Sequence, residues 1–194
     1  MHGNVFRLAG IRHTRAFTES ILELPLLTSL WHRIPWLAFG LIGGLIAARI
    51  IANFETTLEQ NLILAAFIPL IVYMGDAVGT QMEACIIRDL ALDAYLPFRR
   101  YFFRQLLIIG TIGILFGITI FIAASLFFRN AGIGEVLGIA LTAAIISSVF
   151  TGLLIPYFAS KLRLDPADAS GPIATIIQDI LSITIYFAVA TVLL

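Results

Sequence analysis

Residues 101–128 read YFFRQLLIIGTIGILFGITIFIAASLFF, and Arg104 is the only charged residue among them. A helix of about 20 mostly apolar residues crosses the hydrocarbon core of a bilayer, so this stretch is long enough to span it. Gly113 and Gly117 recur in it at the spacing that lets helix backbones approach closely in lipid. The stretch therefore predicts a transmembrane helix that packs against other helices.

The composition of the whole chain agrees with a membrane protein. Of its 194 residues, 60% are hydrophobic and 12% are charged, and 12 basic residues balance 12 acidic ones. Soluble domains are about 45–50% apolar and about 25% charged, and disordered chains are more polar still. No basic excess points to nucleic acid. Motifs for nucleotides or for a nucleophile with its base are missing, so we expect neither an enzyme nor an organic cofactor.

Four more segments are long and apolar enough to span a bilayer, at about 35–53, 58–92, 135–161 and 172–194. The expected fold class is an all-α polytopic membrane protein with five transmembrane helices, in a domain of residues 34–194. Pro35 is expected in the first turn of its helix, where proline is tolerated. Residues 1–33 are expected to form a short cytoplasmic or interfacial segment. Further small residues predict helix contacts at Gly40, Gly44 and Ala48, and at Gly134 and Gly138.

The basic residues predict the orientation of the chain in the membrane. Ten of them precede the first span or flank the connections between spans two and three and between spans four and five, whereas only Arg49 and Arg129 lie on the opposite side. Cytoplasmic loops carry the excess of lysine and arginine. The N-terminus is therefore expected in the cytoplasm and the C-terminus outside.

Two groups of polar residues lie in the expected spans. Asp179 is in the fifth span, and a carboxylate at that depth is expected to face a partner or water. Asp76, Thr80 and Glu83 share one face of the second span if it is helical there. Pro69, Gly75 and Gly79 predict that this second helix is broken near Gly75–Gly79, which would free carbonyl ligands. Two interpretations without an ion-binding role stay open. Asp179 is protonated and bonded to a neighbouring helix in the first, and Glu83 pairs with Arg88 or with cytoplasmic water in the second.

The available ligand types favour a hard cation. All three histidines precede the first span and Cys85 is the only cysteine, so zinc and copper lack their usual ligands. Carboxylate, hydroxyl and carbonyl oxygens suit magnesium, which keeps several of its waters. One carboxylate only half-neutralises a divalent ion, so a second copy related by a two-fold axis is expected to bring a second Asp179 to the same place.

Three stretches resemble the membrane domain of the MgtE-type magnesium and divalent cation transporters. They are HRIPWL at 32–37, PLIVYMGDAVGTQ at 69–81 with Arg88 following, and LDPADASGPIATIIQD at 164–179. The resemblance covers about residues 30–194. It implies a bacterial-type plasma membrane protein that is surrounded by lipid and forms a parallel homodimer with one ion path on its axis. It also implies Mg²⁺ as the transported ion, with Mn²⁺ or Co²⁺ as alternatives.

The resemblance also implies the site residues. Asp179 matches the acid that holds a hydrated ion, Thr175 matches a carbonyl contributor one turn earlier, and Thr80 matches a residue beside the pore. Asp76 and Asp168 depart from the family pattern, which predicts altered ion selectivity. About 30 residues precede the first span, too few for the regulatory CBS module that family members usually carry.

Two other functions stay open. Asp179 is also suited to relay protons in a proton-coupled carrier of another substrate. The glycine stripes alone would suit a membrane scaffold that transports nothing.

Overall fold

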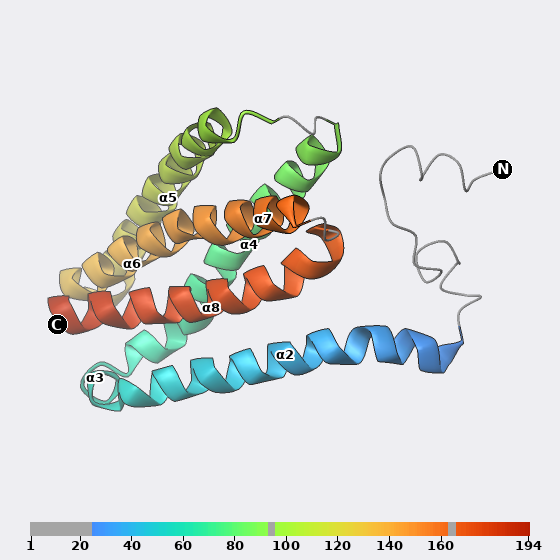
Figure 1. Ribbon diagram of the computed structural model, residues 1–194. Coiled ribbons are helices and arrows are strands. Elements are labelled where there is room, and N and C mark those ends of the chain that lie inside the picture. The colour runs from blue at the N-terminus through green and yellow to red at the C-terminus, as the bar shows by residue number, and fades with distance from the viewer. Residues whose placement is uncertain (1–24, 93–95, 163–165) are drawn as a thin grey trace.

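The computed structural model describes residues 25–92, 96–162 and 166–194, and within these ranges its regular elements are helical (Figure 1). They are α2 (Leu26–Asn53), α3 (Glu55–Gln60), α4 (Ile63–Leu92), α5 (Phe98–Phe128), α6 (Ala131–Val149), a π-helical turn η2 (Phe150–Leu154), α7 (Ile155–Lys161) and α8 (Pro166–Leu193). Most of the expected N-terminal segment lies in residues 1–24, outside the described residues.

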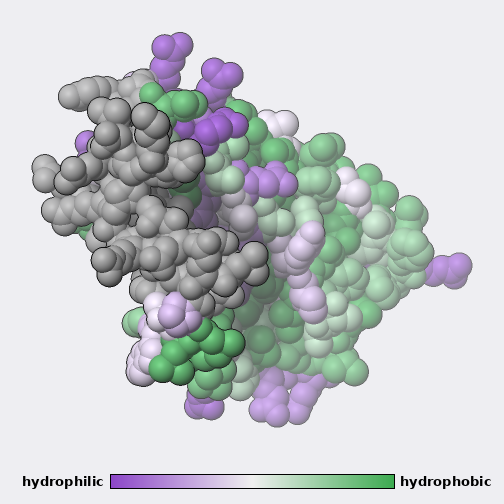
Figure 2. Space-filling view, turned by 90° about the vertical axis from the view of Figure 1, so that its right-hand side faces the viewer, coloured by the Kyte–Doolittle hydropathy of each residue, from purple (hydrophilic) through white to green (hydrophobic). Residues whose placement is uncertain are grey.

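Four helical stretches are long and apolar enough to cross a membrane. They are Ile63–Leu92, Phe98–Phe128, Ala131–Lys161 and Gly171–Leu193, and Leu37–Asn53 forms a shorter apolar helix. Figure 2 shows hydrophobic residues over much of one face, with hydrophilic residues mainly at its margins. The protein is therefore an all-helical integral membrane protein, as its composition predicts.

Two predicted helix features are wrong. Helix α2 already begins at Leu26, so Pro35 lies inside it rather than in its first turn. Helix α4 continues without a break from Ile63 to Leu92 and contains Pro69. Proline inside a spanning helix is tolerated where neighbouring groups satisfy the freed carbonyl. The expected unwinding near Gly75–Gly79 is therefore replaced by ordinary helix.

The glycines of α4 serve helix contact instead of helix breaking. A Cβ added to Gly75 would lie 2.6 Å from Ser182 Oγ, and one added to Gly79 would lie 3.4 Å from the Ser148 side chain. Gly152 in η2 faces the Gly79 carbonyl oxygen so closely that a Cβ would collide with it. The irregular backbone of the bundle thus lies in η2, where an extra residue per turn widens the helix next to α4.

The small residues of α5 and α6 form the predicted contact. Gly113 and Gly117 of α5 pack on α6 near Thr142 and Gly138, and a Cβ on Gly138 would lie 2.9 Å from the Gly117 carbonyl oxygen. Asn130 caps α6 by accepting hydrogen bonds from Gly132 N and Ile133 N. These contacts hold α5 and α6 together as an antiparallel hairpin (Figure 1).

Within the described part of this chain the predicted contacts of Gly40 and Gly44 are wrong, because no described atom lies within 4 Å of an added Cβ at either residue. The small residues that bury against the bundle are Gly43, which faces Ile176 of α8, and Ala47. Helix α8 therefore lies between α2 on one side and α4 and α6 on the other (Figure 1). This central place positions the polar residues of α8 against several helices.

Candidate ion-binding site

Helices α4 and α8 pack antiparallel and bring the predicted polar residues together. The Tyr186 hydroxyl donates a hydrogen bond of 2.8 Å to the Leu64 carbonyl oxygen near the start of α4. Further along α4, Gly75 faces Ser182, which precedes Tyr186 in the chain. Residue numbers therefore rise along α4 as they fall along α8, and this register places Asp179 beside the part of α4 that follows Gly75.

This register places the two predicted acids near each other. Asp76 and Asp179 are both partly buried, and their carboxyl groups are close enough to interact electrostatically. Two carboxylates that share a poorly hydrated place repel each other, and a cation between them removes that repulsion. The pair is therefore the part of the described chain best suited to attract a divalent ion inside the membrane.

The two predicted threonines continue the same line. Thr80 lies one turn after Asp76 on α4, and Thr175 lies one turn before Asp179 on α8, so both lie on the same side of the acid pair. Thr80 is exposed and Thr175 is partly buried. The structure thus brings the two acids together and leaves the threonines on the adjoining turns.

Glu83 follows Asp76 and Thr80 along α4, and it is buried, with 8% of its surface exposed. Its Oε1 would lie 4.0 Å from a Cβ on Gly171, near the start of α8. Arg88 forms its ion pair with Asp89, at 3.1 Å. The side chain of Asp168, the other departure from the family pattern, lies outside what the structure describes.

The acid pair does not make a complete ligand shell. Within the described residues, no group of three or more His, Cys, Asp or Glu side chains gathers in one place. Magnesium needs six oxygen ligands and sheds water reluctantly. Two carboxylates with neighbouring hydroxyl and carbonyl oxygens therefore suit an ion that keeps much of its water.

A buried amide next to Asp179 was missed by the sequence analysis. Gln178 is 1% exposed, and its Oε1 accepts a hydrogen bond of 2.7 Å from Thr151 Oγ1 in η2. Its Nε2 donates to the Ala144 carbonyl oxygen at 3.1 Å and to Ser182 Oγ at 3.0 Å. A third acceptor, Ser147 Oγ, lies at 3.2 Å. The signal in the sequence is an amide side chain within a spanning segment, which the sequence analysis did not consider.

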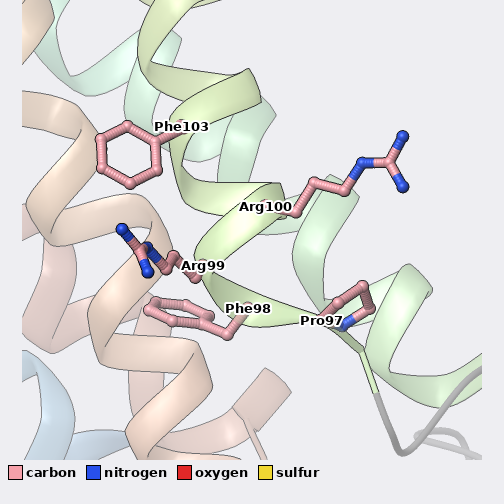
Figure 3. A pocket seen from close by; sticks show the side chains of 5 residues that line it. All are labelled: Pro97, Phe98, Arg99, Arg100 and Phe103. Carbon is pink, nitrogen blue, oxygen red and sulfur yellow. The ribbon is translucent and has the colours of Figure 1, made fainter.

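Another pocket lies where α5 begins, and Figure 3 shows Arg99 between the rings of Phe98 and Phe103. The Arg99 guanidinium carbon is 6.0 Å from the centre of the Phe103 ring, a cation–π contact. Arg100 points away from this group (Figure 3). The pocket contains cations and apolar side chains but no carboxylate, so it does not suit a metal cation.

The family model described as "MgtE: Divalent cation transporter" matches residues 68–189, which include α5, α6, η2 and α7 and most of α4 and α8. This match covers both acids and more than half of the chain. The chain belongs to the MgtE family. The family consists of transporters and not of enzymes, in agreement with the sequence analysis.

Curated MgtE relatives align over most of this chain. The magnesium transporter MgtE of Bacillus subtilis is 37% identical over 163 residues, which are 83% of this chain and 36% of that protein. The magnesium transporter MgtE of Enterococcus faecalis is 36% identical over 175 residues, 89% of this chain and 38% of that protein. That of Thermus thermophilus is 29% identical over 173 residues. The chain thus spans somewhat over a third of the length of these MgtE relatives.

Proposed function

We propose that this protein transports Mg²⁺ across a membrane, down its electrochemical gradient, along a path that passes Asp179 and Asp76. The observation that carries the proposal is the register of α4 and α8, which places Asp179 beside the part of α4 that contains Asp76. Intramembrane acids are costly and face a partner or an ion path. The relatives named as magnesium transporters support Mg²⁺ as the ion, and Mn²⁺ and Co²⁺ are the alternatives with similar ligand preferences.

Each site residue has a distinct part in this proposal. Asp179 and Asp76 supply negative charge and accept hydrogen bonds from the waters of the hydrated ion. Thr175 supplies a backbone carbonyl oxygen one turn away, and Thr80 supplies a hydroxyl group at the exposed edge of α4. All of these are oxygen ligands, which hard cations prefer.

We further propose that two chains form a parallel homodimer with the ion path at or near its axis. The charge of Asp179 alone no longer requires this, because Asp76 already supplies a second carboxylate from the same chain. The support comes from exposure: Thr80 and Gln81 are exposed within the long apolar helix α4. Polar side chains at that place are better covered by protein or water than by lipid tails. A second copy of the chain would cover them with protein and enclose a water-filled path between the two copies.

The full proposal places five helices across the membrane, with α2 as the first, the N-terminus in the cytoplasm and the C-terminus outside. Basic residues gather at one end of the bundle, where Lys161 lies 5.5 Å above the Tyr157 ring and Tyr157 stacks on Phe98 at the start of α5. Arg129 lies at the opposite end of α5. An excess of positive charge at one end supports a cytoplasmic position for that end.

Flux into liposomes tests the proposed function. Purified protein is reconstituted, a Mg²⁺ gradient is imposed at equal internal and external pH, and entry is followed with a trapped magnesium dye. We expect Mg²⁺ entry without a pH gradient. Uptake that requires a pH gradient would favour the proton-coupled carrier. Mg²⁺ entry no faster than in protein-free liposomes would favour a membrane scaffold that transports nothing. Either result contradicts the proposal.

A further inference from the structure

The amide of Gln178 has a fixed orientation at the junction of α4, α6, η2 and α8. The carbonyl oxygen of Ala144 can only accept a hydrogen bond, so the NH₂ group must face it, at 3.1 Å. The opposite side of the amide then presents Oε1 to the Thr151 hydroxyl, at 2.7 Å. The reverse orientation would place Gln178 Oε1 against the Ala144 carbonyl oxygen, where two acceptors meet, so the Ala144 contact selects the orientation and the Thr151 hydroxyl agrees with it.

Neighbouring residues leave room for this amide. A Cβ added to Gly75 would lie 2.8 Å from Gln178 Nε2, so any larger residue in α4 would press on the network. Ser147 Oγ donates a 2.7 Å hydrogen bond to the Ala144 carbonyl oxygen and remains free to accept from Nε2. Residues of α6 and η2 and one glycine of α4 therefore converge on a single side chain of α8.

Inside a membrane, such a hydrogen-bond network contributes strongly to the rotation that a helix adopts about its axis. Apolar contacts between helices hardly favour one helix rotation over another, because lipid tails are as apolar as the side chains they replace. A buried amide does discriminate, since any rotation of α8 away from its partners leaves polar groups unpaired. The hydrogen bonds of Gln178 therefore define the rotation of α8 about its axis.

We propose that Gln178 is a positioning residue that fixes the direction of the Asp179 carboxylate. Consecutive residues of a helix point about 100° apart, so an amide held against α6 and η2 turns the next side chain toward Asp76 of α4. A rotation by one residue would put the Asp179 carboxylate against the Ala144 carbonyl oxygen, where two acceptors meet. This inference rests on the proposed ion path and adds the residue that aligns it.

The test compares two variants that each remove buried hydrogen bonds of α8. Gln178→Met keeps the length and volume of the side chain but removes the amide. Tyr186→Phe is the matched control: Tyr186 is completely buried, its hydroxyl donates a hydrogen bond to α4, and it lies two turns beyond Asp179. Mg²⁺ flux in liposomes gives the half-saturating concentration and the maximal rate, and thermal unfolding in detergent gives stability with and without Mg²⁺.

We expect Gln178→Met to raise the half-saturating Mg²⁺ concentration about tenfold, the lower end of what loss of an outer-shell partner costs a metal site. The Mg²⁺-dependent rise in unfolding temperature should shrink in parallel. Tyr186→Phe should lower the unfolding temperature without Mg²⁺ while its half-saturating concentration stays within about twofold of wild type. An unchanged value in Gln178→Met, or equal shifts in both variants, would overturn the inference.

A second variant covers the case in which Gln178→Met does not fold. Thr151→Val removes the hydroxyl that donates to Oε1 and keeps the shape of the side chain, so we expect a smaller shift in the same direction, about threefold. A wild-type value in Thr151→Val would then overturn the inference. Wild-type protein that neither carries Mg²⁺ nor is stabilised by it would overturn the proposed function and this inference together, whereas a failure of the variants alone leaves the function standing.

Discussion

Asp76 is the residue whose role the structure changes most. It interacts electrostatically with Asp179, so this chain supplies two acids from two adjacent helices. We expect Asp76→Gly to raise the half-saturating Mg²⁺ concentration about fivefold, because one of two negative charges facing a divalent ion is lost. The ranking of Mg²⁺, Mn²⁺ and Co²⁺ should change as well. Competition flux assays in liposomes measure both quantities.

The matched control for Asp76→Gly is Asp89→Ala. Asp89 lies on the same helix but binds Arg88 and the Tyr101 hydroxyl, away from Asp179. The Asp89→Ala variant should leave the ranking of Mg²⁺, Mn²⁺ and Co²⁺ unchanged. An unchanged ranking in Asp76→Gly itself would place Asp76 away from the ion path.

Charged residues of the site could be predicted from the sequence, but the amide network could not. Asp179 and Asp76 stand out because a carboxylate in an apolar span has few tolerable surroundings. Their mutual approach depends on the α4–α8 register, which no local pattern specifies. Gln178 is visible as an amide within a spanning segment, but its partners Thr151 of η2 and Ala144 of α6 lie 27 and 34 residues away in the chain.

Among the elements, the α5–α6 hairpin gives the clearest case of glycine contact. Gly117 faces α6 so closely that an added Cβ would lie 2.7 Å from the Gly138 carbonyl oxygen. We expect Gly117→Ala to lower the free energy of unfolding by about 1–3 kcal/mol through overpacking. Denaturant titration of the protein in detergent micelles measures the change.

Gly110→Ala is the matched control on the same helix. An added Cβ at Gly110 meets no atom of the described residues within 4 Å, so this variant should stay within about 0.5 kcal/mol of wild type. Equal losses in both variants would mean that glycine stabilises α5 for a reason other than contact with α6.

Most spans could be predicted from apolar length, whereas the two backbone details could not. Proline and glycine in 58–92 suggested a broken helix, yet Gly75 and Gly79 are small because Ser182 and Ser148 approach them. The π-helical turn at Phe150–Leu154 contains no proline itself, and Pro156 follows it in α7. It is formed where Gly152 meets the Gly79 carbonyl oxygen, a tertiary contact that periodicity does not contain.

At the scale of the whole molecule, the exposed polar edge of α4 predicts where two copies meet. We expect Thr80→Cys, in a Cys85→Ala background, to form covalent dimers with a short thiol cross-linker in liposomes. Thr111→Cys on α5 is the control, since Thr111 is exposed and its hydroxyl bonds only the Leu107 carbonyl oxygen of its own helix. Gel mobility measures the outcome, and cross-linking at Thr111 but not at Thr80 would place the dimer contact elsewhere.

The central claim is that the ion passes the Asp179 carboxylate, and Mg²⁺ flux through Asp179→Ala in liposomes tests it most directly. Glu135→Ala is the matched control, because it removes an exposed acid from another spanning helix. Flux should fall to the level of protein-free liposomes in Asp179→Ala, and in Asp179→Asn, which keeps the shape and loses the charge. Glu135→Ala should conduct as wild type does. Wild-type flux through a well-folded Asp179→Ala protein would contradict the account.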